Sequence, residues 1–451
     1  MAEDLFRPIF VPERLREAVS GRAWLQAMLD AEGALAVAEA RAGLIPPEAA
    51  EAIASRCDAG LFDPEEIGSE GRVAGNPVPS LVRALTGAVS KASEDAARHV
   101  HKGATSQDIM DTAAMIVARR ALDLILIEVD GLSTACVRLA DAHRETMMAG
   151  RTLLQQALPT TFGLKAAGWL VSALEARRRL LEARSSGLAA QLGGAAGTLA
   201  SLGGSGVLVL EEFARELELT EPVVPWHTNR SRISELGATL SLVAGVMGKI
   251  SLDVVLMAQT EVGEVSEPPA DGRGGSSTLP HKRNPVLSVT AVASARRVQD
   301  LSRTLQAATM GEHERAAGAW HAEWEALGDA LALTGGAAAA AREVVEGLQV
   351  HTGRMRENLG ATRGLLLSEH VTTIAARKLG RLEAHELIEA VSQRTLESGR
   401  SLREELMAEP ALRGALSQEE IDAALDPARY LGSAGVFIDR AIELYRNERL
   451  T

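Results

Sequence analysis

The sequence predicts an all-α protein with a central bundle of long helices. Aromatic residues make up only 3% of the 451 residues, with two tyrosines in all, while alanine and leucine recur throughout. Alanine and leucine favour helices, whereas aromatic residues favour strands. No strand-like segment is followed by a glycine-rich turn and a helix, so the sequence does not support a dinucleotide-binding sheet.

Apolar residues recur at helical spacing in five segments that are each longer than 25 residues: 111–146, 160–191, 232–262, 285–310 and 323–348. Helices of this length must bury an apolar stripe against one another, which is bundle architecture. After residue 351 the helical segments shorten and glycine and proline return. We therefore predict an N-terminal helical domain (1–108), a central long-helix domain (109–350) and a small helical C-terminal domain (351–451).

Charge and cysteine usage exclude several classes of protein. The chain has 47 Lys and Arg against 60 Asp and Glu, a formal charge of −13, which lacks the basic footprint of a general nucleic-acid binder. Cys57 and Cys136 lie far apart with no nearby histidine pair, so neither a disulfide framework nor a zinc site is expected. We expect a cytoplasmic protein with no membrane partner, no metal and no cofactor.

Three polar segments interrupt the Ala/Leu background. The first, residues 99–112, contains His99, His101 and Lys102 just before hydroxyl and amide side chains and a long helix. Thr105 or Ser106 could simply cap that helix, with Asp108 in its first turn. A helix N-terminus beside cations is equally suited to bind a carboxylate, and the sequence leaves both interpretations open.

The second segment, residues 150–161, could be an ordinary interhelical turn, in which one helix ends at Pro159 and the next begins at Thr160.

The third segment, residues 272–285, does not have the residue order of a phosphate-binding P-loop. A glycine-rich loop that presents serine, lysine and asparagine can nevertheless bind an anion. A serine hydroxyl becomes a base only where cations and N–H donors stabilise its alkoxide, and Lys282 can contribute to that field. A plain surface loop is the competing interpretation.

Together the three segments resemble the fumarase/aspartase superfamily in order and approximate spacing. Gly275-Ser-Ser-Thr-Leu-Pro-His-Lys-Arg-Asn-Pro285 is similar to its signature GSSxMPxKxNP, with Leu279 in place of the usual methionine. Thr105-Ser-Gln-Asp108 resembles the first motif region of that superfamily and Gly150-Arg-Thr152 the second. The resemblance extends over nearly the whole chain.

The resemblance implies removal of a proton α to a carboxylate and loss of a group from the β carbon. Ser276 would be the catalytic base, while Lys282 and Asn284 would hold the carboxylate that becomes a dianion. Thr105 and Ser106 would bind a second carboxylate, with His101 beside the reacting groups. The resemblance further implies substrate contacts from Gln155, Ser277 and Arg230, a small polycarboxylate substrate, and a homotetramer whose active sites are shared among subunits.

Two departures from the superfamily pattern bear on the leaving group. The histidine that donates a proton in many members is replaced by Leu153, and its glutamate partner by Val289. A carboxylate, with a reference pKa of about 4, leaves without protonation, whereas an amine does not. His101–Asp108, Leu154-Gln-Gln156 and Glu312-His-Glu-Arg315 further resemble a branch that expels an internal carboxylate, which implies an intramolecular lyase, or cycloisomerase. An adenylosuccinate lyase or other lyase of the superfamily, and a non-catalytic helical homologue, are the alternatives.

Overall fold

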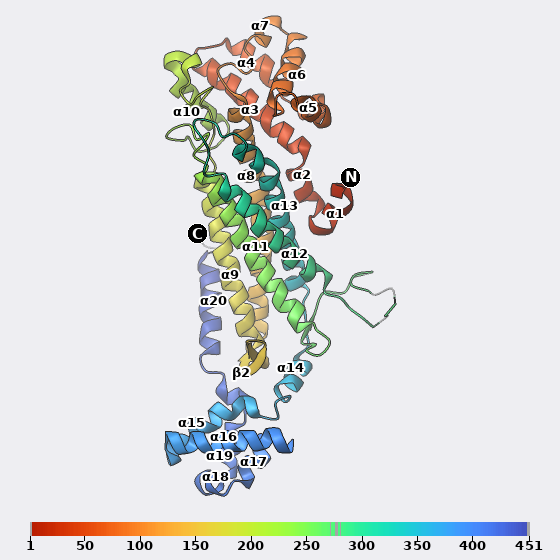
Figure 1. The fold of residues 1–451 in the computed structure, drawn as a ribbon, viewed down its shortest axis with the longest axis vertical. Coiled ribbons are helices and arrows are strands. Elements are labelled where there is room, and N and C mark those ends of the chain that lie inside the picture. The colour runs from red at the N-terminus through yellow and green to blue at the C-terminus, as the bar shows by residue number, and fades with distance from the viewer. Residues whose placement is uncertain (1, 271, 276–277, 280, 449–451) are drawn as a thin grey trace. The chain divides into compact units, whose positions relative to one another are not determined.

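The computed structural model describes residues 2–270, 272–275, 278–279 and 281–448. Helices dominate it (Figure 1), and the predicted all-α class is confirmed. The chain forms two compact units, one made of Met1–Asp130, Glu175–Lys249 and Thr290–Ala341, the other of Gly131–Leu174, Ile250–Val289 and Arg342–Thr451. The division into three domains at residues 108 and 350 stays a prediction.

Five long helices contribute segments to both units: α8 (Ser106–Ala142), α9 (Phe162–Glu182), α11 (Ser231–Met257), α12 (Val286–Ala307) and α13 (Ala319–Glu346). They correspond to the five predicted segments, with different ends. The predicted helix 160–191 stops at Glu182 and continues only as a π-turn, Ala183–Gly187 (η2). Several glycines follow, and glycine inside a helix costs about 0.5–1 kcal/mol relative to alanine.

The remaining elements of the first unit are also helices, most of them short. They are α1 (Ala2–Phe10), α2 (Glu13–Ala18), α3 (Gly21–Arg41), α4 (Pro47–Ala54), η1 (Ala59–Leu61), α5 (Pro64–Gly71), α6 (Val78–Ser90), α7 (Glu94–Ala97), η3 (Ala200–Ser205) and α10 (Gly206–Glu216). Helix α3 begins where the Ser20 hydroxyl accepts a hydrogen bond from the Ala23 amide, as an N-cap should. It packs against α4 and α10.

Helix α11 is the most apolar of the long helices. By length and composition it could cross a membrane, and half of its most apolar window is buried. Within the first unit it lies very close to α12, because a Cβ atom built on Gly248 would sit 2.7 Å from Ala295 Cβ. Within the second unit its Asp253 accepts a 2.7 Å hydrogen bond from Trp169 Nε1. These contacts are those of a helix packed in a protein core.

The second unit contains all the strands described. They are β1 (Met147–Thr152), β2 (Gln155–Thr161), β3 (Val265–Ser266) and β4 (Gln349–Val350), paired antiparallel as β1–β2 and β3–β4. The sequence predicted only a turn at residues 150–161, whereas β1 and β2 form a hairpin there. A strict alternation of apolar and polar residues is absent from 147–161, so this hairpin has no period-2 signal in the sequence.

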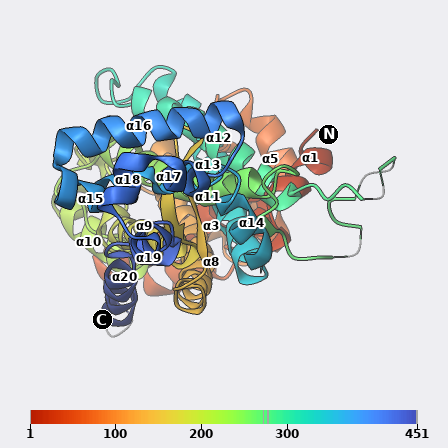
Figure 2. The same cartoon turned by 90° about the horizontal axis from the view of Figure 1, so that it is seen from below.

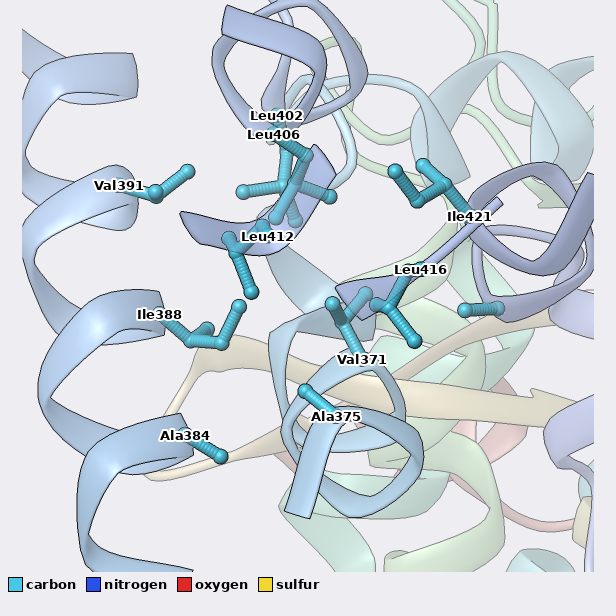
Figure 3. Close-up of a cluster of buried hydrophobic side chains, with 11 residues drawn as sticks. Val371, Ala375, Ala384, Ile388, Val391, Leu402, Leu406, Leu412, Leu416 and Ile421 are labelled. Atoms are coloured by element: carbon cyan, nitrogen blue, oxygen red, sulfur yellow. The ribbon is translucent and has the colours of Figure 1, made fainter. Parts of the chain in front are cut away.

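The C-terminal helices of this unit surround a small apolar core of their own (Figures 2 and 3). The elements after β4 are α14 (Thr352–Leu359), η4 (Leu365–Leu367), α15 (Ser368–Leu379), α16 (Arg381–Ser398), α17 (Leu402–Ala408), α18 (Pro410–Ala415), α19 (Gln418–Ala424), η5 (Pro427–Tyr430) and α20 (Ala434–Glu448). The buried residues of the core lie between the start of α15 and the end of α19. Capping boxes at Ser401 and Ser417 begin α17 and α19. Val391, Leu406 and Leu412 are fully buried between these helices.

We expect Leu406→Ala to lower the free energy of unfolding by about 2–5 kcal/mol, because it removes a buried side chain and leaves a cavity. Leu396→Ala is the matched control, since Leu396 lies on α16 but is 64% exposed. Urea unfolding followed by circular dichroism measures both. Equal losses in the two variants would contradict this account of the C-terminal core.

Candidate active site

The N-terminus of α8 is built around the buried carboxylate of Asp108. Helix α8 starts at Ser106, and the Thr105 amide donates a 2.9 Å hydrogen bond to Asp108 Oδ2, so Asp108 lies in the first turn as one interpretation predicted. Asp108 also accepts bonds from the amides of Gly193 and Gly194, each at 2.9 Å, and its Oδ1 lies 2.7 Å from His227 Nε2. This carboxylate therefore ties two distant segments, residues 193–194 and His227, to one helix end.

Residues 193–194 must be glycine for this arrangement. A Cβ atom on Gly193 would lie 2.8 Å from Pro225 Cβ and 2.9 Å from His227 Cε1. Gly194 has a φ of +69°, which side chains rarely adopt. Because the backbone of residues 193–194 comes close to Asp108, two of its amides reach the carboxylate. The hydroxyls of Thr105 and Ser106 lie half-buried at the same helix end.

A second cluster of buried charged side chains lies one turn further along α8, at Asp111. Arg230 is 2% exposed and bonds Asp111 at 2.7 and 3.0 Å and both oxygens of Glu323. Burial alone would lower the pKa of Arg230, but the two carboxylates outweigh it and raise that pKa. Trp320 Nε1 donates a further 3.0 Å bond to Asp111.

This environment changes the role expected for Arg230. The sequence prediction gave it a substrate contact, yet its guanidinium is buried and bonded to two carboxylates of its own unit. Four of its five N–H donors are used in these bonds, so it has little capacity left for a substrate carboxylate. In this structure Arg230, which directly precedes α11, joins Asp111 of α8 to Glu323 of α13, and its predicted substrate contact stays a prediction.

His101 lies in the turn before α8, in the left-handed conformation with φ +58°. Its Nδ1 lies 2.7 Å from Oε1 of Glu32, a buried carboxylate on α3. Burial opposes charge on this imidazole, but Glu32, by charge and hydrogen bond, and Asp108 raise its pKa above the ordinary value. The first unit thus brings His101, Thr105 and Ser106 together around one helix end.

Sequence reasoning missed several residues that build this end of the helix. Asp108 stands in a string that carried the resemblance and was given only a place in the first turn of the helix, and His227 was given no role. Arg315 was likewise quoted only within a string, and its guanidinium donates to Gln107 Oε1 at 3.1 Å and to the Ala195 carbonyl at 3.3 Å. Only contacts between distant segments reveal these roles, so no local spacing could have found them.

The β1–β2 hairpin of the second unit presents Leu153 and Leu154 at its tip. Both adopt positive φ values, +50° and +66°, as in a type I′ turn, and Leu153 is 97% exposed. The predicted substrate contact Gln155 follows and is also exposed. The positive φ values of two leucines mark a strained two-residue turn.

Below the tip, the hairpin is anchored by a buried carboxylate. Arg151 donates two bonds, of 2.9 and 2.7 Å, to Glu264, which also accepts a 2.8 Å bond from Asn358 Nδ2. Glu264 is fully buried, so this bidentate pair is shielded from water. The base of the hairpin is therefore fixed although its tip is exposed.

The signature loop also lies in the second unit. Ser276 and Ser277 lie outside the described residues. Of the remaining predicted residues, Lys282 is exposed, and Asn284 donates from its backbone and its side chain to the Gly274 carbonyl, at 2.9 and 3.1 Å. Asn284 therefore helps close the neck of the loop. Val289, on the first turn of α12, is 50% exposed.

The carboxylate of Glu267 caps α12 just after this loop. It accepts bonds from the Leu287 and Ser288 amides at 3.2 and 2.7 Å and from the Ser288 hydroxyl at 2.6 Å. The N-terminus of α12 is thus already occupied by an anion of the protein itself. Within the described part of the chain, no group of three or more His, Cys, Asp or Glu side chains is placed to hold a metal ion.

Comparison with known proteins assigns this architecture to a family. A family model described as lyase matches residues 12–299, and one described as adenylosuccinate lyase C-terminus matches residues 364–441. The chain belongs to the fumarase/aspartase lyase superfamily. The match includes the α8 N-terminus, the β1–β2 hairpin and the signature loop, so all three polar segments lie within the matched residues.

Individual relatives extend over the whole chain. A 3-carboxy-cis,cis-muconate cycloisomerase of Bradyrhizobium diazoefficiens is 46% identical, with 97% of each chain covered. A nitrosuccinate lyase of Streptomyces davaonensis is 44% identical, with 97% of this chain and 94% of the relative covered. The crystal structure of a 3-carboxy-cis,cis-muconate lactonizing enzyme from Pseudomonas putida matches at a TM-score of 0.93 and 44% identity, covering 98% of this chain and 99% of that one.

We expect Arg230→Met to destabilise the protein by about 3–5 kcal/mol, because it leaves Asp111 and Glu323 buried without their cation. Arg232→Met is the control, since Arg232 is only partly buried and donates to backbone carbonyls. Thermal unfolding measures both variants. An Arg230→Met protein of unchanged stability with a raised KM would instead restore the predicted substrate contact.

Proposed function

We propose that the enzyme is a 3-carboxy-cis,cis-muconate cycloisomerase, which lactonises 3-carboxymuconate to 4-carboxymuconolactone in protocatechuate catabolism. The observation that carries this proposal is the 46% identity to the Bradyrhizobium cycloisomerase over 97% of both chains. The 0.93 TM-score to the Pseudomonas putida lactonizing enzyme supports it.

Leaving-group chemistry points in the same direction. Leu153 occupies the position where many members of the superfamily carry a proton-donating histidine, and Val289 the position of its glutamate partner. A carboxylate leaves as a stable anion without a proton donor. In the lactonising direction the same carboxylate is the nucleophile, and an apolar Leu153 keeps a competing water from being activated.

The proposed step moves one proton and forms one C–O bond. A substrate carboxylate oxygen adds to the β carbon, the electron pair of the double bond passes into the neighbouring carboxylate, and the α carbon then takes a proton from the Ser276 hydroxyl. Lys282 and Asn284 would stabilise the dianionic intermediate. Nothing is oxidised or reduced, so the step requires no redox cofactor.

The remaining predicted residues would hold the other carboxylates of the substrate. Thr105 and Ser106 offer hydroxyls at the α8 N-terminus, where the helix dipole favours an anion, and His101, whose pKa Glu32 and Asp108 raise, lies beside them. Gln155 and Ser277 would supply further polar contacts. Arg230 serves this site indirectly, through Asp111.

We further propose a cytoplasmic homotetramer. Leu242, Leu252 and Leu256 on α11 are 36–45% exposed in the single chain, and burial of such side chains by other copies is favourable. The proposed partners are thus a small polycarboxylate and three further copies of the chain, with no nucleic acid or membrane.

A second candidate reaction is the elimination of nitrite from nitrosuccinate, because a relative of that activity is 44% identical. Nitrite also leaves as a stable anion, so Leu153 is compatible with both reactions. Leu153 argues against an adenylosuccinate lyase, whose amine leaving group needs a proton. Retention of His101, Ser276 and Lys282 argues against a non-catalytic homologue.

Assays of the purified protein with 3-carboxymuconate, nitrosuccinate and adenylosuccinate test the proposal. We expect turnover of 3-carboxymuconate, followed by its ultraviolet absorbance, and negligible cleavage of the other two. Ser276→Ala should lower kcat by about 10²–10⁴-fold, whereas Ser277→Ala, the matched control, should lower it far less. Efficient nitrite release without lactonisation would replace the proposal by the second candidate.

Subunit exchange tests the shared active site. We expect Ser276→Ala and His101→Ala proteins to be nearly inactive alone. Mixed tetramers should recover activity, because some sites would then combine an intact Ser276 with an intact His101 from another chain. Mass spectrometry of differently tagged subunits verifies that exchange has occurred. Exchange without recovery would indicate a site contained within one chain.

A further inference from the structure

We propose that Glu32, on α3, is a positioning residue for His101: its buried carboxylate holds the imidazole through Nδ1 and favours the protonated ring, whose Nε2–H can then donate to a substrate carboxylate. This inference deepens the proposed function and rests on it for the identity of the substrate. Neither Glu32 nor any other residue of α3 belongs to the motif regions from which the site was predicted.

The geometry of the pair is that of an orienting contact. Glu32 Oε1 lies 2.7 Å from His101 Nδ1, and the Glu32 side chain is fully buried whereas that of His101 is 18% exposed. A carboxylate on one ring nitrogen fixes the tautomer and the orientation of the ring, and leaves the other nitrogen for the reacting group. The backbone of His101, at φ +58°, holds the side chain in a turn that few residues adopt.

Burial of the Glu32 carboxylate costs free energy, which argues for a role of this residue beyond packing. Its Oε2 has no hydrogen-bond partner among the described residues. A buried carboxylate with an unsatisfied oxygen costs free energy that an alanine or leucine in the same Ala/Leu-rich helix would avoid. Such costs are concentrated at functional sites.

The charges facing His101 come from three elements. Glu32 and Glu39 lie on α3, seven residues apart, Asp108 lies on α8, and Lys102 follows His101 in the turn with its ammonium bonded to the Leu44 carbonyl at 2.9 Å. Burial raises the pKa of Glu39 to about 8, with Lys102 opposing that shift and Glu32 adding to it. At neutral pH Glu39 is therefore mostly uncharged, and Glu32 and Asp108 are the anions that act on the imidazole.

This difference between two buried glutamates of one helix supplies a matched pair of variants. Glu32→Gln keeps the shape of the side chain and an acceptor for Nδ1–H but removes the charge. Glu39→Gln makes the same change at an equally buried position whose carboxyl is already neutral at pH 7. A purely structural role predicts similar effects of the two substitutions on stability and on kinetics.

The experiment follows the His101 Cε1–H signal by NMR against pH in the full-length protein, assigned by its loss in His101→Asn, together with kcat/KM against pH. In Glu32→Gln we expect the pKa of His101 to fall by about one unit or more. In the pH profile of kcat/KM, the alkaline limb should move to lower pH by the same amount. The reason is that protonated His101 is the form proposed to bind the substrate carboxylate. At pH 8 the loss should be on the order of 10–100-fold, as for other residues that orient a functional histidine.

Glu39→Gln should change neither the pKa of His101 nor the alkaline limb of the kcat/KM pH profile. Glu32→Asp should keep that limb but lower kcat, because it retains the charge at a longer distance from His101. An unchanged His101 titration in Glu32→Gln would overturn the inference, as would equal displacement of the limb in both glutamine variants. The NMR titration needs no substrate, so it stands even if 3-carboxymuconate is not the substrate. Failure of the proposed function is thus distinguishable from failure of this inference.

Discussion

The arrangement of the first unit depends on two buried carboxylates, Asp108 and Asp111, placed one helical turn apart at the start of α8. A buried charge must be paired and hydrogen-bonded, because its desolvation costs several kcal/mol. Asp108 therefore requires the Gly193–Gly194 amides and His227, and Asp111 requires Arg230. Each partner comes from a segment far away in the sequence, so the end of α8 forms only when all of them are in place. The hydroxyls of Thr105 and Ser106 are presented on this scaffold.

The leaving-group chemistry and the similarity to known relatives restrict the proposed function to different degrees. Leu153, where other members carry a proton donor, selects a class of leaving group, namely anions stable enough to depart unprotonated. Carboxylate and nitrite both satisfy that condition, and relatives of both activities are 44–46% identical to this chain. The proposed class of leaving group therefore rests on a single side chain, whereas the proposed substrate rests on the similarity of the whole chain to its relatives.

In the hairpin of the second unit, the base is anchored by hydrogen bonds whereas the tip is exposed. Arg151, Glu264 and Asn358 fix its base by buried charge-assisted hydrogen bonds, while Leu153 and Leu154 occupy a strained, exposed tip. Strained φ values persist only where the surrounding structure over-determines the backbone. The anchored strands do so here, and they hold the apolar tip in a defined position.

The sequence alone determined the all-α class, the five long helices and the motif regions, because helical periodicity and the eleven-residue signature are local properties of the chain. It did not determine the β1–β2 hairpin, whose strands lack an alternating pattern, or the buried ion pairs of Arg230 with Asp111 and Glu323. Residues such as Glu32 and His227 could not be found from spacing, since Glu32 meets His101 across 69 positions and His227 meets Asp108 across 119. Such pairs exist only after distant segments pack, and the cost of burying unpaired charge then decides which side chains must meet. Tertiary structure thus decided which polar residues are anchors and which are left to meet a substrate.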